Sequence, residues 1–281
     1  GRINDLDMLP PASAFREPLV GIDPYRQNSF IVTSRGCPGY CTYCSSPSFW
    51  GRAVRYRSPG KIADEIEDLY RRDGIIYFSI RDDNFTLKKR RVLDFCGELL
   101  RRKIYILWNC QARVDTVDLE MLVAMKRAGL EHIQYGVESG SPRIQEAMKK
   151  NLTPELCLRA AEDTRKAGII LSVYLMAGMP DEQEDDIDAT VRLVRQMRPH
   201  DGIVSPVASY PGTGLYDELT AAGELPPEYW FTVDDNGPYA RNDRAAKHWV
   251  DRLARELARM GEKNRYGPRD FSLHRSVAGD D

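Results

Sequence analysis

Short apolar runs alternate with longer amphipathic segments along the chain from residue 29 onward. The runs are rich in Ile, Val and Leu and are apolar on both faces, which is typical of buried parallel strands. Between them, apolar residues recur at a helical period, as at Ile62, Ile66 and Leu69, which predicts helices. We expect strands at residues 30–33, 75–80, 104–108, 132–135, 169–175 and 203–208.

Helical segments fill the intervals between these strands. Ser58 followed by Pro59 predicts a helix start, because serine caps a helix and proline fits its first position. Further helices are expected at residues 87–102, 117–128, 154–167 and 184–197. Six strand–helix repeats predict an α/β fold of parallel strands joined by right-handed crossovers. Periodicity alone is compatible with a partial barrel and with an open, doubly wound sheet, and in both cases ligands collect at the carboxyl ends of the strands.

Composition divides the chain into three parts. Residues 1–28 contain four prolines and little periodicity, which predicts a linker or an arm along a surface. Residues 29–219 carry the strand–helix repeats. Residues 220–281 are expected to form a C-terminal extension with a loop at 226–238, a helix at 242–260 and a polar tail.

Charge and cysteine usage narrow the function classes. The 281 residues have a formal net charge of −2, so there is no global basic field for nucleic acid. The longest apolar stretch, residues 168–179, is too short to span a membrane, and no secretory pattern opens the chain. Three of the six cysteines are clustered, which favours metal binding in a reducing compartment over a disulfide framework. We therefore expect a cytoplasmic protein that does not act at a membrane.

The clustered cysteines are the clearest chemical signal. Cys37, Cys41 and Cys44 follow the first predicted strand with C-x3-C-x2-C spacing, and thiolates on so short a loop suit a soft metal or an iron–sulfur cluster. A structural zinc site needs four protein ligands, and the closest histidine in sequence is His132. Three thiolates with one open position therefore favour a 4Fe-4S cluster. A partial zinc knuckle, or three unrelated core cysteines, is the alternative interpretation.

With Tyr43 directly before its last cysteine, the loop resembles the signature of the radical S-adenosylmethionine (SAM) enzymes. The resemblance implies a partial (β/α)6 TIM-like barrel in which Cys37, Cys41 and Cys44 bind three irons and SAM binds the fourth. It implies reductive cleavage of SAM to a 5′-deoxyadenosyl radical that abstracts hydrogen from a small-molecule substrate. It also implies a flavodoxin- or ferredoxin-like electron donor, and it places Tyr43 near the cluster and the adenine of SAM.

Other segments resemble the radical SAM subgroup that is associated with a cobalamin-binding domain. Residues 82–85 read Asp-Asp-Asn-Phe, residues 136–140 read Gly-Val-Glu-Ser-Gly, and residues 211–213 read Pro-Gly-Thr. Many radical SAM enzymes have Gly-Gly-Glu after the second strand, and this chain departs from that pattern. The resemblance implies that Asp82 or Asp83 holds the amino group of SAM or contacts the substrate, and an Asx cap on the next helix is the alternative.

Polar residues at the ends of the next strands are further candidates for cofactor binding. Arg113 could bind the SAM carboxylate or an acidic substrate, or could form a salt bridge with Asp115 or Glu138. The resemblance implies that Glu138 reaches SAM from the fourth strand, and Gln134 lies on the same face of that strand. Gly178 permits close approach of the backbone to a ligand, in a region that the family uses as an apolar wall for adenine.

The resemblance favours methylation or rearrangement of an unactivated carbon. The alternatives are a methylthiotransferase-like RNA-modifying enzyme, for which the additional cysteine and RNA-binding domains are missing from these residues, and a non-catalytic metal-binding module. The subgroup carries cobalamin on a separate N-terminal domain, often through a histidine in an Asp-x-His-x-x-Gly motif, and none of the four histidines here lies in such a motif. We therefore expect cobalamin only if a further domain supplies it.

Overall fold

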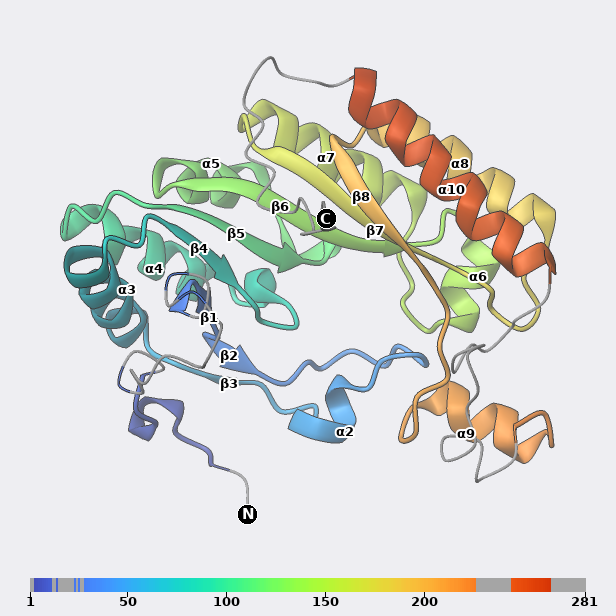
Figure 1. Cartoon of the computed structure of the whole chain (residues 1–281), viewed down its shortest axis with the longest axis horizontal. Coiled ribbons are helices and arrows are strands. Elements are labelled where there is room, and N and C mark those ends of the chain that lie inside the picture. The colour runs from blue at the N-terminus through green and yellow to red at the C-terminus, as the bar shows by residue number, and fades with distance from the viewer. Residues whose placement is uncertain are drawn as a thin grey trace, which may run out of the picture.

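A computed structural model describes residues 3–11, 14, 23, 25, 28–225 and 244–263 of the chain. Its main feature is a curved sheet of six parallel strands with helices along its outer face (Figure 1). The strands of this sheet are β1 (Phe30–Ile31), β4 (Tyr77–Ile80), β5 (Leu107–Ala112), β6 (Leu130–Glu138), β7 (Ile170–Ala177) and β8 (Asp201–Pro206). The alternation of apolar runs and amphipathic segments in the sequence thus corresponds to a parallel α/β fold.

The order of the strands decides between the two architectures. Within the sheet it is β1-β4-β5-β6-β7-β8, which is also their order along the chain, and every neighbouring pair is parallel. A doubly wound sheet reverses direction at a switch point, whereas a barrel adds each new strand on the same side. The expected partial (β/α)6 barrel is therefore confirmed.

Side-chain caps begin several of the helices, including the predicted one at Ser58. Ser58 accepts a hydrogen bond from the Lys61 amide at the start of α3 (Pro59–Asp73), and Thr153 caps α7 in the same way. The other helices of the barrel and its extension are α4 (Lys89–Arg101), α5 (Leu119–Arg127), α6 (Pro142–Ala147), α7 (Pro154–Lys166), α8 (Glu184–Met197), α9 (Gly214–Ala221) and α10 (Arg244–Lys263). Among the described helices, none is long and apolar enough to cross a membrane.

Strand β5 differs most from its expected position. We expected residues 104–108, whereas the strand covers Leu107–Ala112 and includes the polar residues Asn109 and Gln111. Trp108 and Cys110 face the helices and are fully buried, while Asn109 points to the inside of the barrel and accepts a hydrogen bond from Ser79 Oγ at 2.8 Å. The concave face of the sheet is thus polar here, and this polarity concealed the strand in the hydrophobic pattern.

Packing outside the sheet follows the amphipathic pattern. Phe85, Phe95 and Trp108 meet edge to face with ring centroids 5.6–5.8 Å apart between α4 and the sheet. Helix α10 lies along β8 and α8, with Trp249 and Leu253 buried, as expected for the final helix (Figure 1). The expected loop at 226–238 and most of the expected N-terminal linker and polar tail lie outside the described residues.

Candidate active site at the cysteine loop

The cysteine loop, residues 36–45, is held at the carboxyl end of the parallel strands. It connects β2 (Ser34–Arg35), which pairs with β3 (Arg55–Tyr56), to the short helix α2 (Ser46–Trp50). Thr42 joins the loop to two other elements, because its amide donates to Met148 O at 3.0 Å and its carbonyl accepts from the Leu215 amide at 2.8 Å. Gly36 begins the loop with φ +101°, and a Cβ there would lie 2.8 Å from Ala53 O. The loop therefore has a defined position before any ligand binds.

The three thiols of this loop share one electrostatic environment. Cys37, Cys41 and Cys44 are free and half-buried. Burial raises the pKa of Cys37 and of Cys44, and the neighbouring thiolates together with Asp83 raise it further. A Cβ on Gly39 would lie 3.4 Å from Cys37 Sγ and 3.9 Å from Cys41 Sγ, so this glycine leaves both sulfurs uncovered. A cationic centre bound here would relieve the mutual repulsion of the thiolates.

The arrangement of the thiols bears on which metal group they suit. Among the described residues, no three His, Cys, Asp or Glu side chains are placed to hold a single metal ion. In an iron–sulfur cluster each thiolate binds a different iron, so the sulfurs do not have to meet at one point. A soft set of three thiolates on one loop therefore fits a cluster better than a mononuclear site.

The two candidate aspartates have different surroundings. Asp82 is 1% exposed and accepts hydrogen bonds from the amides of Thr33 and Ser34 at 2.6 and 3.0 Å and from both of their hydroxyls. Its carboxylate thus ties the end of β4 to the segment that leads into the cysteine loop. Asp83 is exposed, accepts a hydrogen bond from Ser46 Oγ at 2.7 Å, and lies close enough to Cys37 to raise its pKa. Of the two, Asp83 is the carboxylate with room for a ligand.

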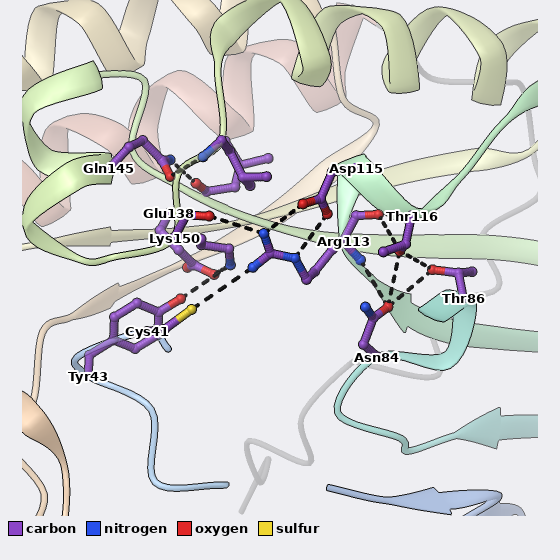
Figure 2. A network of polar contacts seen from close by, with 12 residues as sticks. Cys41, Tyr43, Asn84, Thr86, Arg113, Asp115, Thr116, Glu138, Gln145 and Lys150 are labelled. Atoms are coloured by element: carbon purple, nitrogen blue, oxygen red, sulfur yellow. Dashed lines mark hydrogen bonds and ion pairs between the residues drawn. The ribbon is translucent and has the colours of Figure 1, made fainter. Parts of the chain in front are cut away.

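Glu138 lies opposite the cysteine loop in a buried ion pair. Its Oε1 is 2.6 Å from Nζ of Lys150, and both side chains are more than nine-tenths buried. Lys150 also donates to the hydroxyl of Tyr43 at 3.2 Å, so the three residues form a chain between β6 and the cysteine loop (Figure 2). Burial raises the pKa of the Tyr43 phenol well above its ordinary value, and the carboxylate of Glu138 and the nearby thiolates add to this effect.

The backbone at Glu138 is strained. Its φ is +65°, in the left-handed region that residues with a Cβ rarely adopt, and the register of β6 against β7 shifts between Gly136 and Glu138. Gln145 stabilises this turn by donating from Nε2 to the carbonyls of Val137 and Ser139 at 2.7 and 2.6 Å. Strain of this kind is often retained at functional sites, where it aims a side chain that regular geometry would turn elsewhere.

Arg113 is occupied by protein partners. Its guanidinium holds Asp115 through two parallel hydrogen bonds of 2.9 and 2.8 Å, one of the two pairings that the sequence left open. It also donates to Lys150 O at 3.1 Å and approaches Cys41 Sγ to 4.0 Å (Figure 2). Burial opposes the charge of Arg113, but the bonds to Asp115 outweigh it and raise the pKa of the guanidinium.

Gln134 lies on β6, and Gly178 directly follows β7. Gln134 is 6% exposed, and its Oε1 has no hydrogen-bond partner among the described residues. Gly178 has φ +99° just after β7, and its amide donates to Glu182 Oε2 at 2.6 Å. Met176, two positions before Gly178, packs in the same small apolar cluster as Tyr43. The structure thus groups Tyr43, Glu138 and Arg113 around the cysteine loop, with Gln134 in the barrel interior.

Sequence reasoning missed Lys150. It follows Lys149 after the short helix α6, where paired lysines normally indicate a solvated surface. Only Lys149 fits that expectation, because its side chain is 58% exposed while that of Lys150 is 6% exposed. No local signal separates the two, since Glu138, the partner of Lys150, comes from β6.

A sequence profile described as the Radical SAM superfamily matches residues 31–194. An uncharacterized methyltransferase of Pyrococcus horikoshii is 28% identical over 258 residues, which cover 90% of this chain and 56% of that protein. The anaerobic magnesium-protoporphyrin IX monomethyl ester cyclase of Rubrivivax gelatinosus is 28% identical over 221 residues, covering 77% of this chain and 40% of that protein. The chain spans about half the length of these curated relatives, or less.

Solved structures show the same fold. The radical S-adenosylmethionine methyltransferase TsrM from Kitasatospora setae, with tryptophan substrate and a SAM analog bound, superposes with a TM-score of 0.70 at 21% identity. The superposition covers 84% of this chain and 52% of that chain. The partial barrel is therefore shared with proteins of low sequence identity.

Proposed function

This chain belongs to the radical SAM superfamily, and on that premise we propose that it is the catalytic barrel of an enzyme that cleaves SAM reductively and uses the resulting radical in a transferase reaction. The observation that carries the proposal is the position of the cysteine loop. It lies at the carboxyl end of the strands and opposite the strained, buried Glu138. That edge is where parallel α/β barrels assemble their active sites.

We assign the roles of the residues by their chemistry. Cys37, Cys41 and Cys44 are the cluster ligands, because they are the only grouped thiolates among the described residues. When bound, a 4Fe-4S cluster supplies the electron that cleaves SAM to methionine and a 5′-deoxyadenosyl radical. Glu138 and Asp83 offer carboxylates to a ligand ammonium group, and Lys150 offers the opposite charge to a carboxylate.

We propose methylation or rearrangement of a carbon centre as the reaction class. The named relatives are a methyltransferase and a cyclase, and the solved structure with bound substrate is that of a methyltransferase, which supports this class. Generating the radical needs a one-electron donor, for which we propose a flavodoxin- or ferredoxin-like protein. The six free cysteines are consistent with the reducing cytoplasm as the compartment. Cobalamin enters the proposal only through a domain beyond these residues.

The proposal is tested by anaerobic reconstitution with iron and sulfide, followed by reduction in the presence of SAM. The wild-type chain is expected to become brown, to bind about four irons per chain as a cubane cluster requires, and to release 5′-deoxyadenosine. Cys41→Ala is expected to lose the stable cluster and SAM cleavage, because it removes one iron ligand. Iron content, the cluster absorbance and chromatography of the nucleoside products are the measurements.

Cys96→Ala is the matched control. Cys96 is a buried thiol on α4, and burial raises its pKa to about 12, as expected of an inert core cysteine. This variant is expected to form the cluster and to cleave SAM. A folded Cys96→Ala protein without a cluster would overturn the ligand assignment, and a colourless wild-type protein that retains zinc would favour the non-catalytic metal module.

A further inference from the structure

Arg113 lies beside the sulfur of Cys41 and is held by Asn84, and the proposed function uses neither residue. The two residues follow neighbouring strands, β4 and β5, and are joined because Asn84 Oδ1 accepts from the Arg113 amide at 3.4 Å (Figure 2). Both are well shielded, with Asn84 only 4% exposed and the side chain of Arg113 20% exposed. Hydrogen bonds in such surroundings are less screened by water than those on an exposed surface.

The donors of Arg113 are almost fully assigned. A guanidinium has five N–H groups in a rigid fork. Nε and Nη2 donate to the two carboxylate oxygens of Asp115, and Nη2 also donates to Lys150 O at 3.1 Å. This clamp leaves Nη1, which approaches Cys41 Sγ to 4.0 Å. The sequence suggested a role for Arg113 in binding the SAM carboxylate, but its geometry directs it to a cluster ligand.

Asn84 supports Arg113 from the end of the neighbouring strand. Its Oδ1 accepts from the hydroxyls of Thr86 and Thr116 at 3.1 and 3.3 Å, and from the Arg113 amide, which can only donate. The amide orientation is therefore determined, and Nδ2 is the free end. Nδ2 is buried and has no partner among the described residues. In Figure 2 Asn84 and Cys41 lie on opposite sides of the Arg113 side chain, so Asn84 contacts Arg113 and not the sulfur.

Donors at a ligand sulfur have a known effect on an iron–sulfur cluster. Reduction adds negative charge to the cluster, and an N–H donor or a positive charge nearby stabilises the reduced state more than the oxidised state. Removing such a donor lowers the reduction potential. The two hydrogen bonds to Asp115 fix the guanidinium of Arg113 in position before reduction. The side chain therefore does not have to move when the cluster accepts an electron.

We propose that Arg113 sets the reduction potential of the cluster by donating an N–H bond toward the sulfur of Cys41, and that Asn84 helps to hold Arg113 in place through its backbone amide. They are positioning residues rather than ligands. This inference rests on the proposed function, because it requires that the cysteine loop bind a cluster. It assigns to Arg113 a task different from holding SAM.

The experiment is a redox titration of the reconstituted protein without SAM, followed by the electron paramagnetic resonance signal of the reduced cluster. In Arg113→Gln, reduction is expected to become about tenfold less favourable, which for one electron is a midpoint potential lower by about 59 mV. Asn84→Ala removes the acceptor of the Arg113 amide without adding a charge, so it is expected to shift the potential in the same direction by a smaller amount. Iron and sulfide content are measured alongside each titration.

Arg195→Gln is the matched control, because Arg195 forms the same kind of two-point pair, with Glu256 on α10, at 2.9 Å and away from the cysteine loop. It is expected to leave the potential unchanged. Equal potentials in Arg113→Gln, Asn84→Ala and the wild type, at equal iron content, would overturn the inference while leaving the proposed function intact. If Arg113→Gln does not retain a cluster, Asn84→Ala decides the outcome. A wild-type protein without a cluster contradicts the proposed function instead.

Discussion

At the scale of single residues, the most informative feature is the buried pair of Glu138 and Lys150. A charge buried to this extent is tolerated only when it is paired, and the pair lies beside Tyr43 of the cysteine loop. The left-handed backbone of Glu138 is a second feature that destabilises the fold at the same position. Because both features of Glu138 cost stability, we attribute them to ligand binding.

We predict that Glu138→Gln weakens SAM binding by about tenfold or more, or about 1.4 kcal/mol, while the cluster assembles normally. The substitution keeps the shape of the side chain and removes its charge, so an ammonium group loses its partner. Calorimetric titration of the reconstituted protein with SAM measures the affinity.

Glu218→Gln serves as the control for this substitution, because Glu218 pairs with the exposed Lys149 at 3.6 Å. It is expected to change neither SAM affinity nor stability noticeably. If Glu138→Gln binds SAM as tightly as the wild type but unfolds at a lower temperature, Glu138 is a structural ion-pair partner and its assignment to SAM is wrong.

At the scale of elements, the connection from α8 into β8 is held by a histidine. The amide of His200 donates to Leu171 O at 2.8 Å, and Nδ1 of its ring accepts from the Leu171 amide at 3.0 Å. The ring thus continues the hydrogen bonding between β7 and β8 with a side-chain acceptor, which exists only while Nδ1 is unprotonated. Burial lowers the pKa of His200, His132 and Arg165 lower it further, and Asp201 opposes them.

We predict that the protein loses thermal stability as the pH falls below about 6.5, the ordinary pKa of histidine. Because the folded pKa of His200 is lowered, the unfolded state binds more protons below that pH, and stability decreases there while it is fully present above it. The expected decrease in Tm is on the order of 2 °C between about pH 7.5 and about pH 5.5, measured by calorimetry.

His200→Asn tests the origin of this dependence. The Oδ1 of asparagine can occupy the position of Nδ1 and accept from the Leu171 amide, but it does not titrate. The variant is therefore expected to have a flatter pH profile than the wild type. An identical acid-dependent loss of Tm in both proteins would assign the effect to other groups.

At the scale of the whole molecule, the final helix completes the core of the barrel. Helix α10 packs against β8 and α8, and it places Trp249, Leu253 and Leu257 in the same apolar core as the sheet. Arg195 of α8 pairs with Glu256 of α10 at the border of this contact. The outer face of β8 therefore depends on a helix that comes after the last strand–helix repeat.

We predict that Leu253→Ala lowers the free energy of unfolding by about 2–5 kcal/mol, the usual range for truncating a buried leucine. Leu253 is 1% exposed, so the substitution leaves a cavity between α10 and the sheet. Urea unfolding followed by circular dichroism measures the change. Arg255→Ala, at an exposed position of the same helix, is expected to stay within about 0.5 kcal/mol of the wild type. Equal stabilities of the two variants would place α10 outside the cooperative core.

Local patterns in the sequence predicted most of the fold and the chemical nature of the site. The alternation of apolar runs and amphipathic segments predicted the strands and helices, because burial repeats with the period of each structure. Ser58 marked a helix start, because a cap acts within one turn. The spacing of Cys37, Cys41 and Cys44 indicated the metal chemistry, because it lies within a single loop.

Tertiary structure decided which of these groups meet. The strand order distinguished a partial barrel from a doubly wound sheet, since pairing joins residues that are distant in the chain. Asp82 and Asp83 are neighbours in sequence. In the folded chain Asp82 is buried against Thr33, whereas Asp83 lies beside the cysteines. Lys150 reaches Tyr43 across 107 positions, and such contacts depend on the folded arrangement rather than on any local period.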